Sequence, residues 1–415
     1  MARIYPFHPL RYSEQAGPLE NLVTQPYDKI SPAMQARYLS LSPYNLVRVI
    51  LGERAPSDSA SDNPYTRAAS HLHSWIASGI LAREREPGIF PCFQEFAVPD
   101  TGERLVRKGF IALGAVEDYS AGVVHRHEQT LAGPKKDRLE LLRHTHAHFG
   151  QLFMLYPDPE GCIDALLDRA AAGPPLAQVT DEYGAVHRLW KIAASAGIPD
   201  LMRDKKLLIA DGHHRYETAL AFRGENPGLP GSDRVMMTFV NMHSPGLKIL
   251  ATHRLVSGIS ASGLPTEGFP GDFLRKAAFD FQVDEIDSLD RLQRSWDESA
   301  NRTVIGAAIG DRLFRMEERN ARDELDVRIL HDRILGGVLG IGEEAVRNER
   351  HLRYIRGLDA ARDAARQGSA QIAFLLKPVS VERVAATSFA GGVMPQKSTD
   401  FYPKLLSGLT IYKLD

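Results

Sequence analysis

The sequence predicts a mixed α/β (α+β) protein with a mixed-sheet main lobe and a more helical second lobe. Residues 205–222 read as a short apolar strand, an Asp-Gly turn and then a helix. Strand patterns dominate the chain before this stretch, whereas residues 261–370 carry charge-rich helical patterns. We therefore expect a main lobe over 1–260, a helical lobe or insertion over 261–370, and a segment over 371–415 that returns to the main lobe.

The composition is that of a globular chain and argues against several classes of function. A chain of 415 residues that is 43% hydrophobic can bury a large core. The formal net charge of -2 provides no broad positive field, so a nucleic-acid partner is not expected. Membrane association is not expected either, because no apolar stretch reaches spanning length and the N-terminus lacks the apolar core of a signal peptide. Cys92 and Cys162 fit a reducing cytoplasm and provide no zinc or disulfide spacing.

Short elements are expected at the start of the chain. Ser31-Pro32 is typical of a helix start. The apolar run at residues 45–51 predicts a strand, and residues 65–81 repeat apolar side chains at helical spacing. Two strand patterns on either side of the turn at residues 99–104 predict a hairpin. Further along, residues 234–242 form a strong strand candidate that we expect to pair beside the strand at 207–211.

The strand–turn–helix stretch is the strongest candidate for a site. Asp211 and Gly212 fall where the strand ends and the helix begins. The first N–H groups of a helix have no helical partner and the helix dipole is positive there, so a phosphate is favoured. Arg215 adds a planar fork of donors, while His213 and His214 can donate hydrogen bonds or move a proton. A purely structural role for the two histidines is the alternative, but the concentration of polar residues in one turn favours an anion site.

Two carboxylates elsewhere are candidates for chemistry. Asp28 lies in a loop before a helix, where a carboxylate either caps local structure or acts as a general base or metal ligand facing the turn. Glu128 precedes a second helix that begins at about Lys135. We expect Glu128 and Asp211 to be the candidate metal ligands.

Lysines and arginines at two further places are candidates for binding anions. Lys135, Lys136 and Arg138 stand at a helix start, where positive charge is unfavourable, so either an anionic partner or solvent exposure is expected. Lys397 lies in a polar stretch of the C-terminal segment and is a candidate for neutralising a ligand phosphate. Apolar side chains follow in residues 401–412, so an ordered tail is expected.

Several segments together resemble a bacterial family known only as domain of unknown function 1015. The turn sequence DGHHR also resembles, at a greater distance, the phosphate-binding turn of the ParB/sulfiredoxin superfamily, which includes nucleotide-dependent free-serine kinases with a DGH-x-R turn. That second resemblance implies a ParB/sulfiredoxin-like phosphate site and serine as an acceptor. The segments similar to the family are PYDKIS, NLVRVIL, HEQTLAGPKKDRLELL, ADGHHRYETAL, VNMHSPGLKILATHRLV and MPQKSTDFYPKLLSGL.

The leading hypothesis is a nucleotide-dependent phosphotransferase that acts on a small hydroxylated metabolite, possibly serine. ATP or ADP would be the donor with Mg²⁺ assisting, because positioning and charge neutralisation do most of the work in phosphoryl transfer. Asp28 would take or orient the acceptor proton, and residues 213–215 would hold the phosphates. The chain lacks a phosphate-binding loop of the Walker type and the protein-kinase motifs. The alternative is a nucleotide- or phosphometabolite-binding regulatory protein without turnover; a homodimer is possible in either case.

Overall fold

The computed structural model forms two compact units, each described here by itself. The first comprises Met1–Lys248, Ala385–Gly392 and Phe401–Asp415, and the second comprises Ile249–Val384 and Val393–Asp400. The long N-terminal part of the first unit runs to Lys248, and the C-terminal part of the chain is divided between the two units. The structure describes residues 1–99, 101–128, 132–194, 197–259, 269–299, 302–320 and 324–414.

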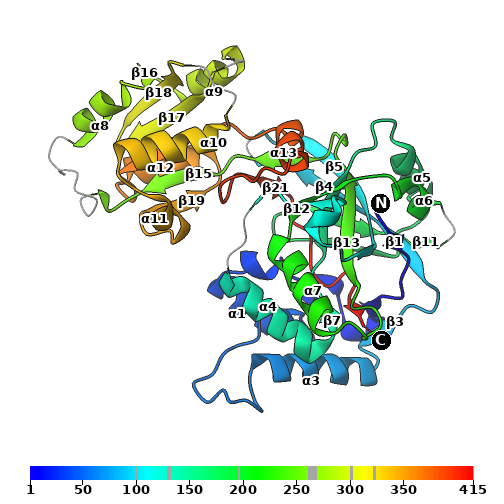
Figure 1. Ribbon diagram of the computed structural model, residues 1–415. Helices are drawn as coiled ribbons and strands as arrows, with labels where there is room; N and C mark the ends of the chain where they lie inside the picture. The colour runs from blue at the N-terminus through cyan, green and yellow to red at the C-terminus, as the bar shows by residue number, and fades with distance from the viewer. Residues whose placement is uncertain are drawn as a thin grey trace. The chain divides into compact units, whose positions relative to one another are not determined.

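A ten-stranded mixed sheet forms the centre of the first unit (Figure 1). β12 runs parallel to β6 and antiparallel to β8, and β8 runs parallel to β13. Two short strands, β1 (Ile4–Tyr5) and β11 (Ile192–Ala193), pair with β5 and β4. The main order across the sheet is β6 (Val124–His125), β12 (Leu207–Asp211), β8 (Leu152–Tyr156), β13 (Arg234–Asn241), β5 (Arg104–Ala115), β4 (Gly88–Ala97), β10 (Val186–Leu189) and β9 (Ala177–Thr180).

Helices and two small two-stranded sheets complete the first unit. β2 (Leu10–Tyr12) pairs with β3 (Leu81–Arg83), and β22 (Tyr412–Lys413) pairs with β7 (Ala147–His148). Helix α4 packs against both α3 and α7. The helices are α1 (Pro32–Leu41), α2 (Val47–Ile50), α3 (Pro64–Ala77), α4 (Ala132–Thr145), α5 (Cys162–Ala170), α6 (Ile198–Met202) and α7 (His213–Glu225), with 3-10 turns η1 (Glu14–Ala16), η2 (Leu19–Asn21), η3 (Tyr27–Lys29) and η4 (Tyr119–Ala121).

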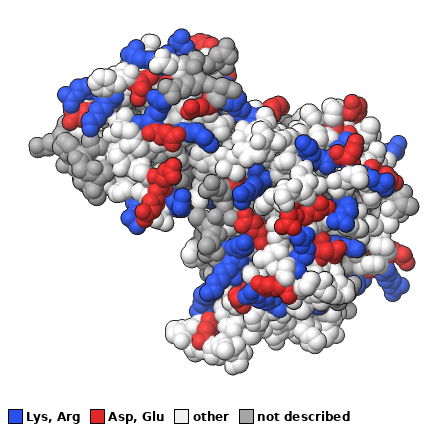
Figure 2. Space-filling view, viewed as in Figure 1, with Lys and Arg blue, Asp and Glu red and all other residues white. Residues whose placement is uncertain are grey.

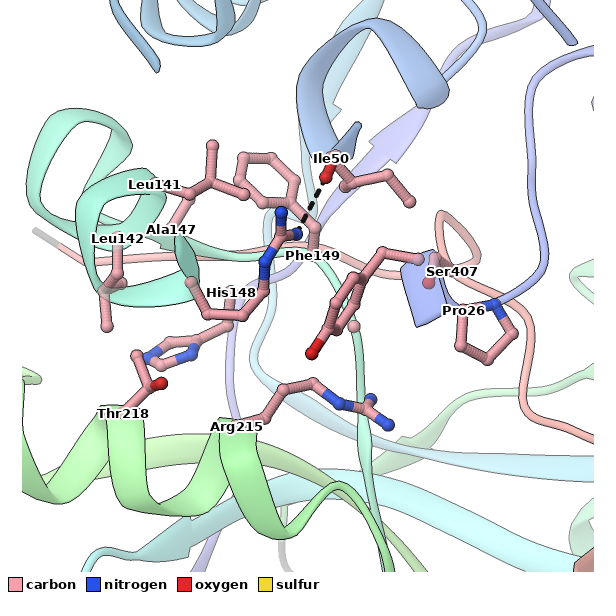
Figure 3. Close-up of a pocket in the computed structure, with 13 residues that line it drawn as sticks. Pro26, Ile50, Leu141, Leu142, Ala147, His148, Phe149, Arg215, Thr218 and Ser407 are labelled. Atoms are coloured by element: carbon pink, nitrogen blue, oxygen red, sulfur yellow. Dashed lines mark hydrogen bonds between the residues drawn. The ribbon is translucent and has the colours of Figure 1, made fainter. Parts of the chain in front are cut away.

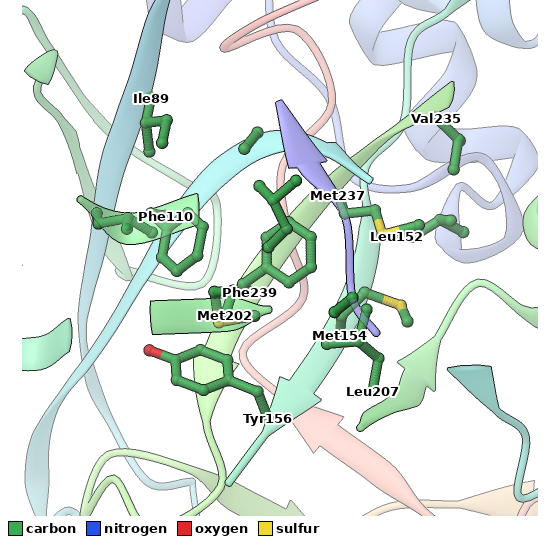
Figure 4. Close-up of a cluster of buried hydrophobic side chains, with 14 of the residues drawn as sticks. Ile89, Phe110, Leu152, Met154, Tyr156, Met202, Leu207, Val235, Met237 and Phe239 are labelled. Carbon is green, nitrogen blue, oxygen red and sulfur yellow. The ribbon is translucent and has the colours of Figure 1, made fainter. Parts of the chain in front are cut away.

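One face of the sheet carries a large apolar core (Figure 4). Phe110 of β5 and Phe239 of β13 stack with ring centroids 5.0 Å apart, and both are fully buried. Met154 and Leu207 from the neighbouring strands β8 and β12 belong to the same cluster. This core fixes β12, and with it the start of α7, against the middle of the sheet.

Several expected elements are confirmed. Helix α1 begins at Pro32 and is capped by the Ser31 hydroxyl, which accepts the Met34 N–H at 3.3 Å. Strands β4 and β5 pair antiparallel as the expected hairpin, from Phe90 opposite Ile111 to Ala97 opposite Arg104. The mixed α/β class is confirmed by the sheets and helices together.

Two local expectations are wrong. Residues 45–51 contain helix α2 and not a strand. Just before the helix the Asn45 side chain accepts the Val47 N–H at 2.9 Å, and Arg48 donates to the Leu39 carbonyl at 2.8 Å. Strand β13 does not pair beside β12, because β8 lies between them. All five residues of β8 are buried, as suits a strand with neighbours on both sides.

The second unit contains an antiparallel six-stranded sheet that the charge-rich sequence did not reveal. Its strand order is β16 (Phe281–Ile286), β18 (Arg312–Glu318), β17 (Val304–Ile309), β20 (Ile372–Leu375), β15 (His253–Val256) and β19 (Leu352–Ile355). The helices within it are α8 (Phe269–Ala277), α9 (Leu289–Glu298), α10 (Asp326–Ile329), the π-helix η6 (Leu330–Val338), α11 (Glu343–Arg347) and α12 (Leu358–Arg366).

Charge is mixed over the surface in view. Lysine and arginine side chains are interspersed with aspartate and glutamate on the face shown in Figure 2. Among the helices that the structure describes, none combines the length and the apolarity needed to cross a lipid bilayer.

The burial of His253 leads us to expect that the folded protein loses stability in mild acid. His253 is buried and accepts the Leu376 N–H at 3.2 Å, and burial lowers its pKa to about 4, helped by the charge of Arg254. In the unfolded chain the imidazole of this residue becomes protonated near pH 6.5, whereas in the folded chain it stays neutral down to about pH 4. The free energy of unfolding therefore falls as the pH drops from about 6.5 to 4, by about 2 kcal/mol at pH 5 for one such group. We expect His253→Asn, which keeps an acceptor, to reduce the pH 7 to pH 5 fall in urea unfolding free energy by about this amount.

The exposed His73 provides the control for this measurement. His73→Asn should leave the fall in unfolding free energy unchanged. If the unfolding free energy of His253→Asn falls between pH 7 and pH 5 as much as that of the parent, His253 is not a group that stays neutral in the folded chain.

Candidate functional site

The site begins at an irregularity in β12. Ile209 pairs with Met154 and Asp211 pairs with Phe153, so Ala210 is an extra residue that forms a β-bulge. Gly212 follows with φ +98°, a left-handed conformation that suits glycine, and helix α7 starts at the next residue. A bulge at a strand end redirects the following side chain, and here it directs Asp211 towards the start of α7.

Asp211 is the carboxylate around which cations gather. Its Oδ2 lies 3.8 Å from Lys404 Nζ and 3.7 Å from an Arg215 nitrogen, and its Oδ1 accepts the Gly212 N–H at 2.9 Å. Burial raises the pKa of Asp211, but the charges of Lys404, Arg215 and Lys29 outweigh it and hold the pKa well below its usual value. The carboxylate is therefore ionised throughout the neutral range.

His213 is the first residue of α7 and is held against a second histidine. The ring centroids of His213 and His127 lie 4.7 Å apart in an edge-to-face arrangement, and the His127 N–H donates to His213 Nε2 at 3.5 Å. The Ile209 carbonyl lies 2.8 Å from His127 Nδ1. Burial lowers the pKa of His127 to about 4, and burial together with the charge of His127 lowers the pKa of His213 well below its usual value. At neutral pH His213 is therefore an uncharged imidazole whose Nε2 accepts, which leaves Nδ1 as the donor.

A buried guanidinium positions the lysine that contacts Asp211. Arg107 on β5 is 1% exposed, and its N–H groups donate to the carbonyls of Tyr402 and Pro403 and to Gln94 Oε1. The Gln94 amide in turn donates to the Lys404 carbonyl at 2.9 Å. Burial lowers the pKa of Arg107 to about 9, so it stays charged at neutral pH. Arg107 on β5 and Gln94 on β4 thus fix the backbone of residues 402–404. The Lys404 side chain then points to the turn.

The same polar network extends towards the segment that carries Asp28. His187 lies 3.2 Å from the Gln94 amide and 3.1 Å from an Asp181 oxygen. That oxygen also accepts from the Gln25 side chain at 3.4 Å. Gln25 stands just before η3, so one chain of hydrogen bonds anchors both Lys404 and the loop at 26–29.

Several positive charges lie close to the turn. Lys29, Arg215 and Lys404 all act on the carboxylate of Asp211, and the Arg107 guanidinium adds a buried charge whose N–H groups donate to Gln94 and Tyr402 oxygens. Removing cations from water is costly unless an anion compensates for it. The start of α7 is therefore suited to binding a further anion.

The predicted site residues lie at different distances from this centre. Asp28 is exposed in η3. One neighbour is Tyr27, whose pKa is raised by burial and lowered in part by the charge of Arg215, and the other is Lys29, which acts on Asp211.

His214 occupies the first turn of α7, and its carbonyl accepts from the Thr218 hydroxyl at 2.8 Å. Glu128 directly follows the buried His127.

Lys397 lies in the second unit, whereas the turn lies in the first. It has φ +57°, its side chain is exposed, and its carbonyl accepts from Arg254 at 3.0 Å. Its role as a phosphate ligand stays a prediction. Sequence reasoning missed Lys404 and Arg107, because nothing in the segment around either residue marks its role.

The carboxylates near the turn could supply only part of the coordination shell of a metal ion. Within the described ranges, no group of three or more histidine, cysteine, aspartate or glutamate side chains is arranged to hold one. Mg²⁺ commonly takes one or two carboxylates and completes its shell with phosphate oxygens and water. An ionised Asp211, with Glu128 as the second candidate, fits that smaller requirement by ligand type.

Gly212 provides a test of the turn geometry. An added Cβ would lie 2.8 Å from Leu152 Cδ2 and 3.2 Å from Arg215 Cζ, on a backbone with φ +98°. We expect Gly212→Ala to lower the free energy of unfolding by about 2–4 kcal/mol and to displace Arg215. Gly17 has φ +94° with nothing within 4 Å of an added Cβ, so Gly17→Ala measures the backbone strain alone. Equal losses of stability in urea for the two variants would refute close packing at the turn.

Solved structures with a similar arrangement share little sequence with this chain. A mutant of free serine kinase in complex with ADP has 12% identity and a TM-score of 0.38, covering 71% of this chain and 89% of its own. A conserved hypothetical protein from Pyrococcus furiosus has 12% identity and a TM-score of 0.36, covering 69% and 92%. SbnI with a C-terminal truncation, from Staphylococcus aureus, has 9% identity and a TM-score of 0.37, covering 72% and 87%.

Sequence comparison identifies the family. No curated protein matches the chain. The family described as "Protein of unknown function (DUF1015)" matches residues 4–333, which is well over half of the chain. The segments around Asp28, Arg107 and the DGHHR turn all fall within that match. The chain therefore belongs to the DUF1015 family.

Proposed function

We propose that this protein is a nucleotide-dependent phosphotransferase that transfers a phosphoryl group from ATP or ADP to a hydroxyl of a small metabolite. The observation that carries the proposal is the gathering of Lys29, Arg215 and Lys404 around the carboxylate of Asp211 at the start of a 13-residue helix. Serine is the acceptor suggested by the resemblance of the turn sequence to free-serine kinases.

The turn and its neighbours would hold the donor's phosphates. The first N–H groups of α7 and the positive end of its dipole favour phosphate oxygens. The neutral His213 contributes a hydrogen-bond donor, His214 lies beside it, and Arg215 and Lys404 neutralise charge that builds up during transfer. These groups are fixed by packing before the ligand arrives, which reduces the cost of reorganisation.

Asp28 is the proposed general base. The acceptor hydroxyl oxygen would form a bond to the terminal phosphorus while the bond from that phosphorus to the bridging oxygen breaks, releasing ADP from ATP or AMP from ADP. Asp28 would accept or orient the hydroxyl proton, which then passes to solvent. Mg²⁺ bound with the nucleotide would neutralise phosphate charge, with Asp211 and Glu128 as its proposed protein ligands.

A regulatory protein that binds a nucleotide or phosphometabolite without turnover is the second candidate. The exposure of Asp28 favours it, because a general base usually acts from a site that closes around the substrate. Both candidates require the anion site, so binding tests the shared part and turnover distinguishes the two.

The binding prediction concerns Arg215. We expect Arg215→Met to weaken ADP binding by at least about tenfold in calorimetry, because a charge-assisted hydrogen bond contributes about 1.5–3 kcal/mol. Arg203 at the end of α6 is exposed and paired with Asp200, so Arg203→Met removes an equal charge and should leave affinity unchanged. If the parent and Arg215→Met bind ADP equally, the anion site has been wrongly placed.

The catalytic prediction concerns Asp28. Purified protein should be supplied with labelled ATP or ADP and with serine and other hydroxylated metabolites. We expect Asp28→Asn to reduce kcat by about a hundredfold or more while nucleotide affinity is retained. The exposed Asp204 just before β12 provides the matched control, and Asp204→Asn should keep full turnover. Tight nucleotide binding without product from any acceptor would favour the regulatory protein instead.

A further inference from the structure

We propose that the pocket beside Arg215 is the subsite for the base of the nucleotide. This inference rests on the proposed function and assigns one part of the ligand to one part of the molecule. The pocket is open to solvent, the empty space in it and at its mouth together is about 540 Å³, and Figure 3 draws the residues that line it. They are Pro26, Tyr27, Ile50, Arg138, Leu141, Leu142, Ala147, His148, Phe149, Gly150, Arg215, Thr218 and Ser407.

The pocket and the phosphate site share the side chain of Arg215 on α7. Arg215 pairs with Asp211 at the turn and also lines the pocket, and Thr218, one helical turn further on, lines it as well. Figure 3 shows both side chains projecting from this helix. A ligand whose phosphates occupy the start of α7 therefore has its remaining part within reach of the pocket.

One wall of the pocket is planar and held in place. The Arg138 guanidinium carbon lies 4.0 Å from the centroid of the Tyr27 ring, so the two flat groups form a stack. Arg138 donates to the Ile50 carbonyl at 2.7 Å and to an Asp137 oxygen at 2.8 Å. These bonds use the N–H groups at the edge of the Arg138 guanidinium. The stack therefore presents a flat surface to the pocket and not an unpaired charge. Flat aromatic and guanidinium surfaces are the ones on which nucleobases stack, with about 1–3 kcal/mol per base.

The remaining lining suits a neutral ring. Ile50, Leu141, Leu142 and Phe149 supply apolar surface, and the hydroxyls of Thr218 and Ser407 are among the few polar groups. Ligand pockets are typically apolar with a few polar groups that set orientation. A nucleobase combines a flat apolar face with a polar edge and matches this lining.

The lining argues against the acceptor as the occupant. None of the lining residues is an aspartate or glutamate, so the ammonium group of an amino acid such as serine would find no carboxylate among them. Arg138 is paired with Asp137, and both arginines in the lining would repel an ammonium group. A buried, unpaired ammonium is costly, whereas an uncharged base avoids that cost.

The test separates the base from the phosphates. Calorimetry would compare ADP with inorganic tripolyphosphate for the parent, Tyr27→Leu and Tyr27→Phe. We expect Tyr27→Leu to weaken ADP binding by about tenfold and to leave tripolyphosphate binding unchanged, because only the base uses the stack. Tyr27→Phe keeps the ring and should bind ADP within about twofold of the parent. Tyr183→Leu is the matched control, because Tyr183 is an exposed tyrosine of the same unit.

Thermal melting confirms that each variant is folded before binding is measured. Unchanged ADP affinity in Tyr27→Leu, with a loss in Arg215→Met, would overturn the base subsite and leave the proposed function standing. An equal loss for ADP and tripolyphosphate in Tyr27→Leu would also overturn it, because Tyr27 would then act through the phosphate site. If the parent binds neither ligand, both the subsite and the proposed function fail.

Discussion

The buried guanidinium of Arg107 is the interaction on which the candidate site depends. It is almost inaccessible to solvent, and its donors meet the carbonyls of Tyr402 and Pro403 and the side chain of Gln94. This buried cation orders the backbone that it binds, and it also adds positive charge near the turn, where the charge of Asp211 acts on it. Lys404 reaches Asp211 because the residues before it are held in this way.

Local patterns predicted the strand, the turn and the helix that form the candidate site. An apolar run, an Asp-Gly pair and a helical pattern are short-range signals, and β12, Gly212 and the start of α7 match them. Ser31 and the hairpin of β4 and β5 were predictable for the same reason. Propensity failed at 45–51, where a short helix forms in a run of strand-forming residues. Val47, Val49 and Ile50 are all buried there, and tertiary packing of this kind overrides the β preference of such side chains.

Long-range relations could not be predicted from one sequence. The insertion of β8 between β12 and β13 depends on packing across the whole sheet, and a strand pattern contains no information about its neighbours. The bonds from Arg107 span 295 and 296 residues, so neither Arg107 nor Lys404 carries a local mark of its role. The sheet of the second unit was hidden for a related reason: the edge strand β16 is only partly buried and carries charged residues typical of an exposed helix face.

The bulge at Ala210 has a consequence for which changes the site tolerates. Side chains alternate between the two faces of a sheet, so one extra residue reverses the face of everything that follows it. Ile209 lies opposite Met154 in the buried core and Asp211 lies opposite Phe153, so the two side chains lie on opposite faces although they are two residues apart. Straightening β12 without removing a residue would turn the carboxylate of Asp211 to the face of Ile209, away from Arg215 and Lys404. The irregular backbone at Ala210 is thus as necessary to the site as the side chains themselves.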